Sequence, residues 1–105
     1  MYRHELCFVL RFGVRGEFDE LAGRLQEQES ARGWSPPRFW HGTTGRVNRL
    51  VIEHEYESVD AFRSQRAAFH EEPGEVGATL ARLAELAVPG TAVEFEFDAL
   101  DTVTA

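Results

Sequence analysis

Apolar and polar residues alternate in three separate stretches of the chain, the pattern of strands that bury one face. These stretches cover residues 4–12, 49–57 and 91–97. The residues of the second stretch divide between two faces, with Leu50, Ile52, His54 and Tyr56 on one and Val51, Glu53 and Glu55 on the other. A shorter strand is predicted over residues 38–42, before a glycine-containing hairpin turn at residues 43–45.

Apolar residues spaced three and four apart predict helices between these strands. Residues 17–32 form the first helix, and Gly33 is suited to end it. The second helix begins after Ser58, a good N-cap residue, and runs to about residue 71. Pro73 separates it from a continuation over residues 75–87. A frayed tail is expected from Asp98 onward.

The predicted order is β-α-β-β-α-β, which defines an α+β, ferredoxin-like fold with an antiparallel sheet. With 105 residues, the chain is expected to form one domain spanning residues 1–105. Both helical regions would cover one face of the sheet. The side chains expected to face the helices are Leu6, Phe8, Leu10, Leu50, Ile52, Val93, Phe95 and Phe97. Those expected to face away are Glu5, Arg11, Glu53, Glu55, Glu94 and Glu96.

Composition and charge exclude several kinds of partner. The net charge of −7 and the scattered arginines argue against nucleic acid. No apolar run is long enough to span a membrane. The N-terminal apolar run lacks a small-residue cleavage site and is interpreted as a strand, so a cytoplasmic protein is expected. The single Cys7 is interpreted as a small buried side chain.

Two segments resemble a known group of proteins. The run GRVNRLVIEHEYESVDAFRSQRAAF, residues 45–69, combines a Gly-x-x-Asn hairpin, a strand with acidic and aromatic residues, and a helix that starts with serine. The run AVPGTAVEFEF, residues 87–97, combines a Pro-Gly turn with an alternating last strand. Both are similar to NIPSNAP-like and antibiotic-biosynthesis-monooxygenase-like proteins of the dimeric α/β barrel group.

This resemblance implies a homodimer whose two sheets form a barrel with the helices outside, and a pocket between sheet and helices. The group includes cofactor-independent oxygenases, polyketide cyclases, haem-degrading enzymes and isomerases, so the resemblance does not select one reaction. The Asn-Trp-His set of the haem-degrading members does not map onto this sequence. No cofactor is therefore predicted.

Histidine and tyrosine on the apolar face of residues 49–57 are the main candidates for chemistry. Histidine titrates near neutral pH and is a natural general base, which makes His54 the predicted base. Tyr56 is predicted to donate a hydrogen bond to a developing oxyanion. His41 and His70 lie on neighbouring elements and are predicted to contact the substrate, whereas no role is expected for His4. The alternative for His54 is a hydrogen-bonded core residue.

Aromatic and polar residues also gather around the predicted second strand. Trp40, Asn48 and Arg49 are predicted to bind or position a planar aromatic ligand. The alternative for Trp40 and for Trp34 is packing at a sheet edge or dimer interface.

The Glu53-His54-Glu55 triplet does not predict a metal site, because adjacent strand residues point to opposite faces. Glu53, Glu55, Glu94 and Glu96 would share a face, which is predicted to be solvated, paired with arginines or placed at a dimer interface, with a bound cation as the minor alternative.

The sequence thus favours a homodimeric enzyme that acts on a hydrophobic, aromatic or polyketide-like metabolite. Proton abstraction by His54 would lead to oxygenation, cyclisation or isomerisation. The alternative is a non-catalytic homodimer that binds ligands or serves in stress responses. A cavity of several hundred Å³ that touches His54 favours the enzyme, and a filled core favours the alternative.

Overall fold

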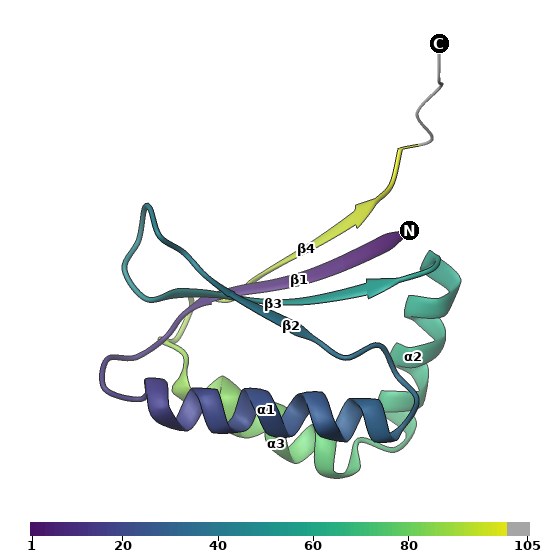
Figure 1. Ribbon diagram of the computed structural model, residues 1–105, viewed down its shortest axis with the longest axis horizontal. Coiled ribbons are helices and arrows are strands. Elements are labelled where there is room, and N and C mark those ends of the chain that lie inside the picture. The colour runs from purple at the N-terminus through teal and green to yellow at the C-terminus, as the bar shows by residue number, and fades with distance from the viewer. Residues whose placement is uncertain (101–105) are drawn as a thin grey trace.

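The computed structural model describes residues 1–100 as a four-stranded antiparallel sheet with three helices on one side (Figure 1). The elements are β1 (Tyr2–Val9), α1 (Arg15–Ala31), β2 (Arg38–His41), β3 (Arg49–Tyr56), α2 (Val59–Glu71), α3 (Gly74–Leu86) and β4 (Val93–Asp98). The strand order is β2-β3-β1-β4. The predicted ferredoxin-like α+β fold is confirmed. The frayed tail does not begin at Asp98 as predicted, because Asp98 ends β4 and the N–H of Ala99 donates to the carbonyl of Met1. Residues 101–105 of that predicted tail lie outside the described residues.

β1 ends three residues earlier than the alternation predicted. The N–H of Arg11 donates to the carbonyl of Leu86 at the end of α3, over 2.9 Å. Leu10 keeps a single bridge to Ala87. After Val9 the backbone therefore bonds to the end of α3 and the residue that follows it, so β1 stops there. The apolar pattern of the sequence nevertheless continues to Phe12.

The helix boundaries follow from local chemistry. The Ser58 hydroxyl accepts a hydrogen bond from the N–H of Ala61 and caps α2, as predicted. Pro73 separates α2 from α3, also as predicted. Arg32 stabilises this break, since its guanidinium donates to the carbonyls of Glu72 and Pro73 over 2.8 and 3.1 Å. In residues 1–100, no helix is both long and apolar enough to cross a bilayer.

The hydrophobic core lies between the sheet and helices α1 and α3. Its buried members come from both layers and include Phe8, Leu50, Ile52, Phe18, Leu25, Val76 and Leu83. Figure 1 shows α1 and α3 side by side beneath the sheet, with α2 at one end. This arrangement leaves a space between α2 and the adjoining ends of β1 and β3, where the candidate site lies.

β4 places its apolar residues on the opposite face from the one predicted. The pairing of β4 with β1 opposes Val93 to Cys7, Phe95 to Glu5 and Phe97 to Arg3. Directly opposed residues share a face, so these three apolar side chains lie on the face without helices. Glu94 and Glu96 lie on the helix side instead. The prediction for β4 is therefore wrong, because alternation shows which residues share a face but not which face is covered.

The face without helices combines paired charges with exposed apolar side chains. The Arg38 guanidinium binds Glu53 over 2.7 Å and Glu55 over 3.0 Å, and Glu53 is buried. Val93, Phe95 and Phe97 keep 50%, 45% and 42% of their surface exposed. Arginine pairing thus accounts for Glu53 and Glu55. The apolar side chains of β4 stay partly exposed, although the Arg3 guanidinium carbon lies 4.8 Å from the centre of the Phe97 ring.

Candidate functional site

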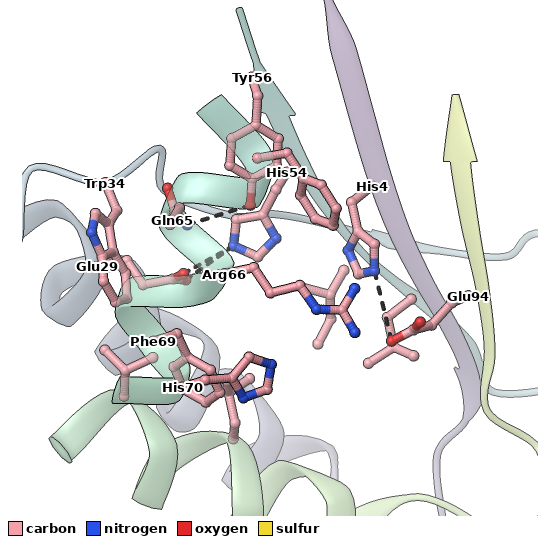
Figure 2. Close-up of a pocket in the computed structure, with 15 residues that line it drawn as sticks. His4, Glu29, Trp34, His54, Tyr56, Gln65, Arg66, Phe69, His70 and Glu94 are labelled. Atoms are coloured by element: carbon pink, nitrogen blue, oxygen red, sulfur yellow. Dashed lines mark hydrogen bonds and ion pairs between the residues drawn. The ribbon is translucent and has the colours of Figure 1, made fainter. Parts of the chain in front are cut away.

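A cavity of about 270 Å³ lies between the sheet and α2 (Figure 2). Most of its wall is apolar and is formed by Leu6, Ile52, Phe62, Phe69, Val76 and Leu80. Its polar groups come from β1, β3, β4, α1 and α2, so residues far apart in the sequence meet here. An apolar recess with a few polar groups is the usual form of a small-molecule site.

His54 and Glu29 form a buried pair at the wall of this cavity. The Nε2 atom of His54 lies 3.1 Å from both carboxylate oxygens of Glu29. The two side chains keep only 12% and 6% of their surface exposed. An ionised carboxylate only accepts hydrogen bonds, so Nε2 is the nitrogen that would donate a hydrogen bond to an ionised Glu29. In that tautomer of the neutral imidazole the lone pair is on Nδ1.

The second ring nitrogen of His54, Nδ1, does not contact Glu29. Within residues 1–100 it has no hydrogen-bond partner, and it is not among the side-chain atoms buried without a partner. Figure 2 shows this nitrogen on the side of the ring away from Glu29. A carboxylate on one ring nitrogen with the other nitrogen open is the arrangement that orients histidine for general-base catalysis.

Glu29 reaches His54 from the last turn of α1. Its carbonyl accepts hydrogen bonds from the N–H groups of Arg32 and Trp34, which fixes the end of the helix. Sequence reasoning missed Glu29, although a signal exists. Glu29 follows Leu25 by four residues and so occupies the buried stripe of α1 where an apolar residue is expected.

Tyr56 continues the same face of β3 and packs beside His54, with ring centroids 6.1 Å apart. Its hydroxyl accepts a hydrogen bond from the Gln65 side-chain amide over 3.3 Å. Burial, together with the negative charge of Glu29, raises the pKa of Tyr56 far above its ordinary value. Tyr56 therefore keeps its proton and can donate it to an oxygen of a ligand.

His4 also belongs to the site, although no role was expected for it. It lies directly opposite His54 across the β1–β3 pair. Its ring stacks on Phe62, and its Nε2 lies 3.7 Å from a carboxylate oxygen of Glu94. Burial lowers the pKa of His4, and this outweighs the opposing effect of Glu94. The pairing register is the signal that would have revealed it.

The structure divides the predicted site residues between the two faces of the sheet. His54, Tyr56 and His70 line the cavity. Trp40, His41 and Arg49 instead border a hollow of about 530 Å³ formed mainly by residues of the other face. These two sets do not come together in the chain.

Asn48 lines neither the cavity nor this hollow. Its backbone has a positive φ of 59°, and its carbonyl accepts a hydrogen bond from the N–H of Leu10. Asn48 thus shapes the turn before β3, since asparagine tolerates this conformation better than most residues.

The proposed carboxylate cluster does not form. Glu53 and Glu55 lie on the face without helices and bind Arg38, whereas Glu94 and Glu96 lie on the helix side. Among residues 1–100, no group of three or more histidine, cysteine or acidic side chains is arranged to hold a metal ion. The cation alternative for these four glutamates is therefore not supported.

Comparison with known proteins relates the fold to solved structures. The sequence matches no protein-family model and no curated protein sequence. A NIPSNAP domain protein from Burkholderia xenovorans superposes with a TM-score of 0.74 at 14% identity, covering 100% of both chains. A NIPSNAP family protein from Agrobacterium tumefaciens gives 0.70 at 17% identity, covering 98% of this chain and 96% of the other.

A solved antibiotic biosynthesis monooxygenase also superposes, with a TM-score of 0.68 at 13% identity and coverage of 95% of this chain and 99% of the other. The chain therefore has the fold found in NIPSNAP and antibiotic-biosynthesis-monooxygenase proteins. This confirms, at the level of fold, the resemblance inferred from residues 45–69 and 87–97.

Proposed function

We propose that this protein is a small-molecule enzyme that removes a proton from a hydrophobic, aromatic or polyketide-like metabolite. The observation that carries the proposal is the buried His54–Glu29 pair, whose free nitrogen is open beside an apolar cavity. The reaction requires no cofactor in its first step, because the base and the hydrogen-bond donor both belong to the chain.

In the proposed first step, Nδ1 of His54 takes a proton from an activated C–H or phenolic O–H group. Glu29 holds the ring in place and stabilises the imidazolium that forms. This stabilisation is stronger than in water, because both side chains are buried and little solvent screens their charges. Glu29 therefore acts as a positioning residue, since it acts through His54.

The anion left on the substrate needs a hydrogen-bond donor. Tyr56 is the proposed donor, because its hydroxyl accepts from Gln65 and its own proton remains to be given. The stabilised enolate or phenolate would then be oxygenated with molecular oxygen as the oxidant, or would cyclise or isomerise without a change of oxidation state. The fold shared with a solved antibiotic biosynthesis monooxygenase is compatible with oxygenation but does not select among these reactions.

The proposal can be tested without the natural substrate. β-Tetralone is a hydrophobic ketone with an acidic C–H group, and its hydrogen–deuterium exchange in heavy water is followed by NMR. We expect the wild-type protein to accelerate this exchange and His54→Ala to lose at least about a hundredfold of the acceleration. His41→Ala is the matched control and should behave as wild type, because His41 is exposed and outside the cavity.

Equal exchange with the wild-type protein and His54→Ala would refute the assignment. Ligand binding without accelerated exchange would favour the alternative, a non-catalytic ligand-binding or stress-associated module. The cavity itself favours the enzyme over a module with a filled core.

The protein is proposed to work as a homodimer formed through the face of the sheet that carries no helices. Val93, Phe95 and Phe97 form an exposed apolar strip there, and Trp40 on the far edge of the sheet is 52% exposed. Neighbouring arginine–glutamate pairs, such as Arg38 with Glu53, would neutralise charge at the interface. A second copy would cover this apolar surface, which is costly to leave in water.

A further inference from the structure

We infer that the ligand of this cavity is an organic acid whose carboxylate binds Arg66 at the cavity mouth. The inference rests on the proposed function only for the reacting end of the ligand, which His54 would meet. It adds the chemical class of the substrate: a planar, apolar body that carries an anionic group.

Arg66 is the only arginine among the residues that line the cavity in the described part of the chain, and that chain has no lysine. It lies on α2, one turn after Phe62 and one turn before His70. Its guanidinium carbon lies 5.8 Å from the centre of the Phe62 ring. The charged end of Arg66 therefore lies near an aromatic ring of the cavity wall, while the residue as a whole stays exposed to solvent.

Within residues 1–100 the Arg66 guanidinium makes no ion pair or hydrogen bond, and its contact is with the face of the Phe62 ring. Several arginines are paired: Arg15, Arg38 and Arg82 bind carboxylates, and Arg32 binds backbone carbonyls. Arg24, Arg46 and Arg63 are unpaired like Arg66 within residues 1–100, but they do not line this cavity. Arg66 makes no such ion pair or hydrogen bond there, although it stands beside an apolar recess. A guanidinium matches the two oxygens of a carboxylate in geometry and charge, and a ligand can supply that partner.

In this cavity the two ends of such a ligand would contact different residues. Figure 2 shows the Arg66 side chain extending past His54 toward the His4 side of the cavity, with His70 beside it on α2. The apolar wall, including Leu6 and Phe62, would hold the body of the ligand. A carboxylate fixed at Arg66 would limit how the body turns and so determine which proton faces His54.

Glu94 is the group whose negative charge would repel an anionic ligand near Arg66. It lines the same cavity from β4 and lies 3.7 Å from His4, with 56% of its side chain exposed. Arg66 is exposed as well, so solvent screens both charges. The attraction would prevail because a guanidinium can form two hydrogen bonds with a bound carboxylate. Removing this charge should therefore strengthen binding of an acid and leave a neutral analogue unaffected.

The test compares β-naphthoate with β-naphthamide, which share shape and differ in charge. Binding is followed by NMR titration of the two tryptophan indole signals, because Trp34 lines the cavity and Trp40 does not. We expect naphthoate to bind about tenfold more tightly than the amide and to shift the Trp34 signal. Arg66→Gln should abolish this preference. Arg63→Gln, on the same helix and outside the cavity lining, should keep it.

Glu94→Gln should tighten naphthoate binding several-fold without changing that of the amide. Equal affinities in the wild-type protein, a preference that survives Arg66→Gln, or no naphthoate binding would each overturn the inference. These results are separate from the test of the proposed function, because naphthoate binding involves no proton transfer and β-tetralone carries no carboxylate. Failure of either experiment leaves the outcome of the other intact.

Discussion

The carboxylate of Glu29 on α1 lies 3.1 Å from Nε2 of His54 on β3, so this contact joins α1 to the sheet at the cavity wall. Both groups are buried and each is the other's polar partner. Removing only one member of such a buried pair strongly destabilises a protein, because the other member stays buried without its partner. The contact therefore affects both the stability of the fold and the chemistry of His54.

Glu29→Gln should reduce proton abstraction while preserving the fold. The amide keeps the size of the side chain but can donate to Nε2, which would move the proton of His54 to Nδ1 and remove the base. We expect exchange of β-tetralone to fall at least about a hundredfold. Glu27→Gln, exposed on the same helix, is the control. Full activity of Glu29→Gln would show that the carboxylate does not orient His54.

Glu29→Ala should in addition destabilise the protein, because it leaves His54 buried without its partner. The expected loss in the free energy of unfolding is about 3 kcal/mol. Urea unfolding followed by circular dichroism measures this loss. A change as small as that of the exposed control Glu27→Ala would mean that the pair contributes nothing to folding.

Tyr56 should affect both rate and alkaline stability. Tyr56→Phe removes the proposed hydrogen-bond donor and should slow exchange of β-tetralone by about a hundredfold. Because burial raises the pKa of Tyr56 in the folded state, the unfolded chain loses this proton first as pH rises. Wild-type stability should therefore fall more steeply above about pH 10 than that of Tyr56→Phe. Parallel stability curves in this range would contradict the assignment.

His4 should make the protein less stable in mild acid. Burial lowers the pKa of His4 in the folded state, so the unfolded chain takes up a proton first as pH falls. The contribution of neutral His4 to the free energy of unfolding is complete above about pH 6.5. It is lost as the pH falls further through the lowered pKa of the folded state. Glu94 and Glu96 favour the charged form, whereas His54 and Arg66 oppose it. Urea unfolding should show that acidification lowers the free energy of unfolding less for His4→Gln than for the control His41→Gln. Equal decreases in the two variants would contradict this interpretation.

The exposed strip on β4 should determine the oligomeric state. Phe95→Asp places a charge in the middle of the strip, which is unfavourable once the strip is covered. Light scattering should report a dimer for the wild-type protein and a monomer for this variant. Phe12→Asp, which is 81% exposed and lies outside the strip, should remain dimeric. A wild-type monomer at micromolar concentration would contradict the homodimer.

The sequence predicted most of the fold, because strand and helix periods are local properties. Alternation located β1 and β3, and Ser58 and Pro73 marked the boundaries of α2. The facing of β4 could not be obtained in this way. Its glutamates and its apolar residues alternate equally well in either orientation, and only the pairing with β1 decides between them.

The candidate site was predicted only in part, for a similar reason. His54, Tyr56 and His70 share the cavity, but Trp40 and Arg49 are separated from it by the sheet. Glu29 and His4 were missed because their roles depend on contacts distant in sequence, from α1 to β3 and from β1 to β3. A charged residue on the buried stripe of a helix is the feature that deserves more weight in such sequences.

The tautomer of His54 tests the central claim most directly and requires no substrate. Nitrogen NMR of histidine-labelled protein at neutral pH distinguishes a protonated ring nitrogen from a bare one. We predict that His54 carries its proton on Nε2, held by Glu29, with Nδ1 bare, and that Glu29→Gln changes this pattern. A wild-type His54 with its proton on Nδ1 would contradict the account, because the nitrogen facing the cavity would then have no lone pair to accept a proton.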